Sequence, residues 1–159
     1  MQKWFIVFFS VIALVGGVGF YQSQQYDFQT ISGESYKWQS LEGQWVVVNY
    51  FAEWCVPCLK EVPELNDFYA QAKKSTEIKL FAVSYDPLSK NQLLEIKKKH
   101  DMQFPLLNPE KTEFIPIQTP KYLPATFIIA PNGDVSKPLL GEQTAASLYQ
   151  AVNQLKQSF

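Results

Sequence analysis

The chain has 159 residues, of which 15% are aromatic and 18% charged, and this composition predicts a packed globular domain and excludes a disordered chain. Its length is enough for one domain with a sizeable core. The formal net charge of -1 argues against a general nucleic-acid-binding surface, which would be basic.

The N-terminal part of the chain is apolar. Residues 4–21 carry no charge and are about as long as the shortest membrane-spanning helices. Lys3 precedes this run and the next positive charge is Lys37, which predicts a cytoplasmic N-terminus and a chain that continues outside. We therefore predict a membrane anchor over residues 1–21. A cleaved signal peptide is the alternative, although its apolar core is usually shorter and an A-x-A site is missing.

After a polar linker at 22–27, the sequence alternates between strand and helix patterns. In chain order it predicts a small hairpin at 28–41, a strand buried on both faces at 45–51, a helix at 59–74, a second buried strand at 78–83, a helix at 89–100, a loop at 108–122, a hairpin of strands 125–130 and 135–140, and a last helix at 144–157. Pro63 is expected to kink or offset the first helix. Leu93, Leu94 and Ile96 are expected on the apolar side of the second. This order predicts an α/β fold with a mixed central sheet flanked by helices.

The two cysteines of the chain, Cys55 and Cys58, lie where a predicted strand is followed by a helix. At this spacing both sulfurs lie in one helical turn and can bond to each other. A structural disulfide that closes so short a loop would stabilise the fold little. Structural zinc needs four ligands, and beyond these thiols the chain has a single histidine, His100. A redox-active dithiol is favoured over both alternatives.

The two sulfurs are expected to differ in reactivity. Cys55 should begin the helix, where unpaired N–H groups and the positive helix end lower its thiol pKa below that of Cys58. Cys55 would then attack a partner disulfide and Cys58 would resolve the mixed disulfide. Val56 offers no charge and no side-chain donor to the thiolate, which predicts a reducing couple. Pro57 stiffens the turn.

Three segments carry a resemblance to a known family: VVNYFAEWCVPC at 47–58, EVPEL at 61–65, and YLPATFII at 122–129 with Asn-Gly at 132–133. The chain resembles the thioredoxin superfamily, and within it the membrane-tethered, extracytoplasmic TlpA-like thiol–disulfide oxidoreductases. These include the reductants of cytochrome c maturation. The resemblance spans about residues 28–157, and residues 28–159 are expected to form a thioredoxin-like domain with an N-terminal hairpin addition.

The resemblance implies roles for further residues. Pro124 is expected to be cis and to pack beside the disulfide, and Leu123 to offer backbone groups to a bound substrate. Glu61 occupies the place of a glutamate that maturation reductases carry three residues after the second cysteine, while Asn49 stands where cytoplasmic thioredoxins carry a buried aspartate. The expected catalytic residues are Cys55, Cys58, Glu61 and Pro124. The expected substrate-binding residues are Trp54, Val56, Pro57 and Leu123.

The predicted function is therefore a thiol–disulfide oxidoreductase that reduces disulfides of exported proteins, with apocytochrome c as one candidate substrate. A membrane thiol donor would supply electrons, and the catalytic domain would face the periplasm or the extracytoplasmic side. Neither a metal nor a cofactor beyond the disulfide is expected. The alternatives are an oxidant or isomerase of the same fold, a Cu(I) chaperone, a peroxidase and a tethered binding module. The copper site would need ligands such as His100 and Met102 close to the motif, and the peroxidase a threonine shortly before Cys55.

Overall fold

The computed structural model describes residues 26–158. The anchor predicted at 1–21 lies outside these residues. Within residues 26–158, no helix combines the length and the apolar character that crossing a membrane requires. Asp27 attaches the start of the described chain to the domain, because its N–H donates to the carbonyl of Tyr36 at 2.9 Å and its carboxylate accepts from the N–H of Trp38 at 2.7 Å.

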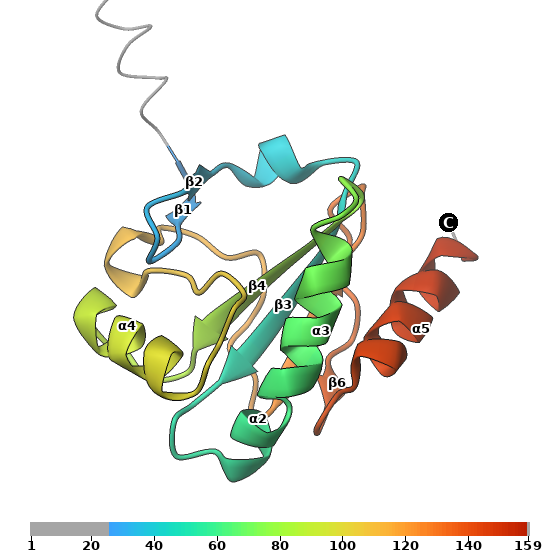
Figure 1. The fold of residues 1–159 in the computed structure, drawn as a ribbon. Helices are drawn as coiled ribbons and strands as arrows, with labels where there is room; N and C mark the ends of the chain where they lie inside the picture. The colour runs from blue at the N-terminus through green and yellow to red at the C-terminus, as the bar shows by residue number, and fades with distance from the viewer. Residues whose placement is uncertain (1–25, 159) are drawn as a thin grey trace, which may run out of the picture.

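A four-stranded mixed sheet forms the centre of the described chain (Figure 1). Its strands are β3 (Trp45–Phe51), β4 (Ile78–Ser84), β5 (Ala125–Ile129) and β6 (Leu139–Leu140), and they lie side by side in the order β4-β3-β5-β6. Strand β3 pairs parallel with β4 and antiparallel with β5. The predicted α/β class and the mixed sheet are confirmed.

The sequence of β3 explains its central position. All seven residues of the strand are buried, as its run of valine and aromatic residues predicts. Alternate residues enter different halves of the core. Val47 and Phe51 pack with the helical side, whereas Val46, Val48 and Tyr50 pack with the N-terminal hairpin. Both faces of the strand are therefore covered.

The helix predicted at 59–74 is in fact two helices, α2 (Val56–Lys60) and α3 (Val62–Ala72), which meet at Glu61. It begins earlier than the predicted residue 59. The break has a simple cause: Pro63 has no N–H to continue the ladder, and its ring clashes with the carbonyl of Leu59 four residues before. The chain therefore restarts its helix, with Pro63 in the first turn of α3.

The other two helices follow their sequence signals. Helix α4 (Lys90–Lys99) begins with a capping box of Ser89 and Gln92, and α5 (Ala145–Lys156) with a capping box of Thr144 and Ser147. Helices α3 and α5 pack against each other beside the sheet (Figure 1). One prediction on α4 is wrong. Leu93 and Ile96 are buried, but Leu94 is exposed, because its place on the helix turns it away from the sheet.

The N-terminal hairpin is confirmed as an antiparallel pair of β1 (Phe28–Gln29) and β2 (Ser35–Tyr36), followed by the 3-10 helix η1 (Trp38–Leu41). It is attached through Phe28, which is fully buried. The ring of Phe28 lies 4.7 Å from that of Trp38 and 5.1 Å from that of Phe81 on β4. This aromatic cluster covers the sheet face opposite α3 and α5.

The predicted returning strand at 135–140 is reduced to β6 and one isolated bridge between Val135 and Ile129. Ser136 interrupts the ladder, because its hydroxyl oxygen accepts the N–H of Ile128 at 3.0 Å in place of a backbone carbonyl. Pro138 then has no N–H to donate. The predicted loop at 108–122 holds one short 3-10 turn, η2 (Pro109–Lys111), and is otherwise irregular.

Replacing Phe28 with alanine should destabilise the protein by about 3–5 kcal/mol, since it removes a buried ring and leaves a cavity between the hairpin and β4. The measurement is chemical denaturation of the oxidised protein. Phe114→Ala is the matched control, because Phe114 is exposed and its loss should change the free energy of unfolding by less than about 0.5 kcal/mol. Similar denaturation midpoints for Phe28→Ala and wild type would show that the hairpin is not part of the cooperative core.

Candidate active site

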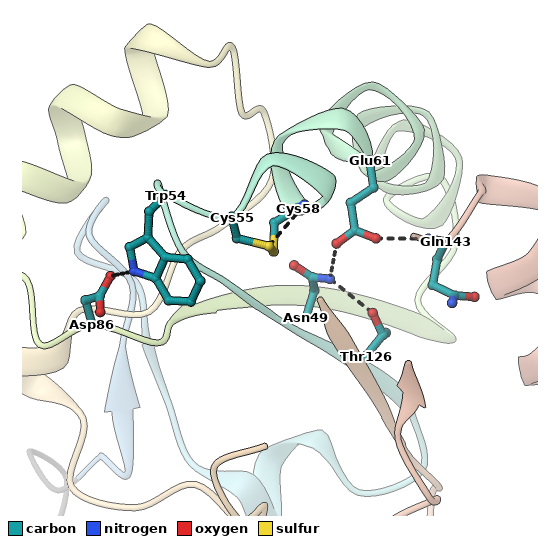
Figure 2. The surroundings of a disulfide bond; sticks show 8 residues. All are labelled: Asn49, Trp54, Cys55, Cys58, Glu61, Asp86, Thr126 and Gln143. Carbon is teal, nitrogen blue, oxygen red and sulfur yellow. Dashed lines mark hydrogen bonds between the residues drawn. A yellow bond between two sulfur atoms is a disulfide. The ribbon is translucent and has the colours of Figure 1, made fainter. Parts of the chain in front are cut away.

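A disulfide joins Cys55 and Cys58 where β3 is followed by α2 (Figure 2). Cys55 is the N-cap of α2, as predicted, and its Sγ accepts the backbone N–H of Cys58 at 3.3 Å. Cys58 lies deeper, with 1% of its surface exposed against 5% for Cys55. On reduction, this N–H and the helix N-terminus would stabilise a thiolate on Cys55. The geometry therefore distinguishes the two sulfurs, since Cys55 caps the helix and Cys58 is the deeper one.

A buried carboxylate lies beside the disulfide. Glu61, at the junction of α2 and α3, is only 2% exposed. Its Oε1 accepts the side-chain amide of Asn49 at 2.8 Å, and its Oε2 accepts the backbone N–H of Gln143 at 2.9 Å. Burial raises the pKa of Glu61 to about 7, although both hydrogen bonds act to lower it. Glu61 can therefore hold or release a proton near neutral pH, as a general acid or base must.

Two partners of this network were not predicted from the sequence. The amide of Asn49 also donates to the hydroxyl of Thr126 at 3.0 Å, across the register of β3 and β5. The available sequence signal for this contact was that Asn49 and Thr126 are polar residues within otherwise apolar strands. Gln143 contributes only a backbone N–H from the loop before α5, and since almost every residue has that group, no sequence signal distinguishes it.

The peptide bond between Leu123 and Pro124 is cis, as the family resemblance implied. Pro124 is buried and immediately precedes β5, while Leu123 is half-buried. Since β5 runs antiparallel to β3, its first residues lie at the same end of the sheet as the disulfide. The proposed role of Leu123 in substrate binding stays a prediction.

Apolar side chains are exposed around the disulfide. Trp54, Val56 and Tyr122 are 64%, 62% and 70% exposed. The Trp54 indole N–H donates to the Asp86 carboxylate at 2.8 Å (Figure 2), and its ring meets Tyr85 edge-on at 6.3 Å. Trp54 is thus held beside the end of β4 and remains open to solvent. Exposed apolar groups of this kind are typical of protein-binding surfaces.

His100 lies closer to the site than its sequence position suggested. Its Nε2 is 3.5 Å from the Glu53 carboxylate, which Lys99 also contacts at 2.8 Å. The hydrogen bond from Lys99 lowers the pKa of Glu53. These three side chains join the end of α4 to the loop just before Cys55. Across residues 26–158, no group of three or more histidine, cysteine or acidic side chains is placed to hold a metal ion.

Comparison with known proteins agrees with this geometry. A family model described as the AhpC/TSA family matches residues 22–137. Thiol-disulfide oxidoreductase ResA of Bacillus cereus is 29% identical over 118 residues, which cover 74% of this chain and 67% of that protein. The protein of the same name from Bacillus thuringiensis subsp. konkukian is 31% identical, covering 79% of this chain and 71% of that protein. The crystal structure of StoA from Bacillus subtilis is similar with a TM-score of 0.65 at 27% identity, covering 80% of this chain and 95% of that chain.

The raised pKa of Glu61 predicts a pH-dependent stability. Between its ordinary pKa of 4.5 and about 7, the folded protein retains a proton that the unfolded chain has released. The stability contributed by this proton is complete below the unfolded pKa and is lost as the pH rises through the folded one. We expect the free energy of unfolding of the oxidised protein to fall over this window, by at most about 3 kcal/mol, and this fall to be absent in Glu61→Gln.

Chemical denaturation at a series of pH values measures this slope. Glu64→Gln is the matched control, because Glu64 lies on α3 and accepts the backbone N–H of Ala145 at 2.9 Å, close to the contact of Glu61. It should keep the slope of the wild type. A slope that survives in Glu61→Gln would mean that another group causes it.

Proposed function

This chain belongs to the AhpC/TSA family and has the thioredoxin fold, and we propose that it is a thiol–disulfide oxidoreductase that reduces disulfide bonds of exported proteins. The observation that carries this proposal is the pairing of the Cys55–Cys58 disulfide with the buried carboxyl of Glu61 at the carboxyl end of β3. A dithiol and a group that exchanges protons near neutral pH are the parts that disulfide exchange needs.

In the proposed reaction, the Cys55 thiolate attacks one sulfur of the substrate disulfide. That disulfide breaks, its other sulfur leaves and takes up a proton, and a mixed disulfide joins Cys55 to the substrate. Cys58 then loses its proton to Glu61 and attacks the Sγ of Cys55. The second substrate thiol is released and the Cys55–Cys58 disulfide forms again, so that two electrons have passed to the substrate.

The residues between the cysteines support the reducing direction. Val56 and Pro57 carry no charge and no side-chain donor, and the donor to the Cys55 sulfur is the backbone N–H of Cys58. Because no side chain between the cysteines adds to that backbone stabilisation, we expect the couple to be more reducing than one with a charged or donor side chain there. An oxidant or isomerase of the same fold would need a more strongly stabilised thiolate and therefore a more stable reduced form.

The exposed surface supports a protein substrate. Trp54, Val56 and Tyr122 form an apolar rim near the buried sulfurs. Leu123, whose peptide bond to Pro124 is cis, would offer backbone groups to an extended segment of the substrate. The uncharged run at 4–21 supports a membrane tether with this domain on the extracytoplasmic side. The proposed partners are therefore a membrane thiol donor and a disulfide-bearing exported protein such as apocytochrome c.

Replacing Cys58 with alanine should trap the substrate, because Cys55 can still attack but no second sulfur resolves the mixed disulfide. We expect covalent adducts in the native host that a reductant releases, seen on non-reducing gels and identified by mass spectrometry. Cys55→Ala is the matched control and should trap nothing, since the remaining sulfur of Cys58 is buried. Equal adducts from both variants would contradict the proposed order of attack.

The redox potential tests the direction. Equilibration with glutathione or dithiothreitol should give a midpoint near that of thioredoxin, at about -270 mV. The reason is that neither Val56 nor Pro57 offers a charge or a side-chain donor that would further stabilise the Cys55 thiolate. A midpoint near the value of about -120 mV that marks a strong oxidant would overturn the reductase assignment and leave disulfide exchange itself intact.

A further inference from the structure

The side-chain amide of Asn49 has one end without a partner. The residue is 1% exposed, and its Nδ2 donates to both Glu61 and Thr126. Its Oδ1 is buried and accepts no hydrogen bond. Figure 2 shows this oxygen pointing toward the Cys55–Cys58 disulfide. An unpaired buried carbonyl oxygen costs free energy, so its position is informative.

The orientation of the amide follows from its partners. Whenever the carboxyl of Glu61 is ionised it can only accept hydrogen bonds, and the amide nitrogen of Asn49 then faces it, as the contact at 2.8 Å shows. A half turn of the amide would place two oxygens 2.8 Å apart instead. The backbone of Asn49 cannot move the side chain elsewhere, because the residue lies within β3 and is paired with Thr126 on β5. The oxygen is therefore directed at the sulfurs by the rest of the network.

We propose that Asn49 is a positioning residue for Cys58, and that its Oδ1 accepts the S–H of Cys58 in the reduced protein. The inference rests on the proposed disulfide exchange. A disulfide has no proton to donate, which explains why the oxygen is unpaired in the oxidised protein. Reduction breaks the Sγ–Sγ bond and adds two electrons, supplied by a donor dithiol that becomes a disulfide, and two protons. The new S–H is the donor that the oxygen lacks.

Cys58 is the sulfur that keeps its proton. Cys55 accepts the N–H of Cys58 and caps α2, so it is the sulfur favoured as a thiolate. Once the disulfide is reduced, an oxygen lone pair beside the sulfur of Cys58 would oppose a negative charge there. One amide thus binds the thiol through its oxygen and the Glu61 carboxylate through its nitrogen. Asn49 thereby keeps Cys58 protonated while Cys55 attacks, and holds Cys58 next to the group that later takes its proton.

The S–H stretching band in the infrared spectrum tests this bond directly. In a Cys55→Ala protein, Cys58 is the one remaining thiol, and its band should lie at lower frequency in the native than in the denatured protein. Adding Asn49→Leu should return the native band to the denatured position. Adding Thr126→Val instead keeps Oδ1 and should leave the band low. A native band at the denatured frequency with Asn49 present would overturn the inference, whether or not Asn49→Leu folds.

The equilibrium with glutathione gives a second readout in the protein with both cysteines. Asn49→Leu removes a bond present only in the reduced state, so we expect the equilibrium constant to shift about tenfold toward the disulfide, which is about 30 mV more negative. Thr126→Val should shift it far less. An unchanged constant in Asn49→Leu, with adducts still trapped by Cys58→Ala, would reject the role of Asn49 and leave the proposed function standing. A lowered S–H band without trapped adducts would support the bond and reject the function.

Discussion

The burial of the Glu61 carboxyl is the constraint around which the site is built. A carboxyl group with 2% exposure needs partners, and it obtains them from Asn49 on β3 and from the backbone before α5. These two bonds connect the central strand, the α2–α3 junction and the C-terminal helix beside one disulfide. The helix break also lies at Glu61. It separates the short helix α2, which begins at Cys55 and contains Cys58, from the longer helix α3.

Much of the fold could be predicted because its signals are local. The buried strand β3 is a continuous apolar run, and α4 begins at Ser89 and Gln92, a spacing that marks a helix start in a sequence. The returning strand at 135–140 could not, because a side chain of Ser136 replaces a backbone acceptor in the ladder. Whether a side chain takes the place of a backbone acceptor depends on how the two strands pair, and the hydrophobic periodicity of the sequence does not encode that pairing.

The same distinction holds at the site. The position of the cysteines and the candidate Glu61 followed from motif and family, and the cis bond before Pro124 followed from family alone. The partners of Glu61 depend on the register of β3 with β5 and on a backbone N–H that any residue could supply. The contact of His100 with Glu53 could not be predicted for a related reason, since the chain between His100 and Cys55 folds back and brings the end of α4 beside the active-site loop.

The aromatic attachment of Phe28 also decides how the domain is held. It fixes the start of the described chain against Phe81 in the middle of β4, on the hairpin side, while α2, which contains Cys58, lies at the opposite end of the described domain (Figure 1). If the preceding residues are tethered to a surface, the reactive end faces away from that surface. A protein substrate would then approach the end of the domain that carries α2, and it could reach the sulfurs without any rotation of the domain.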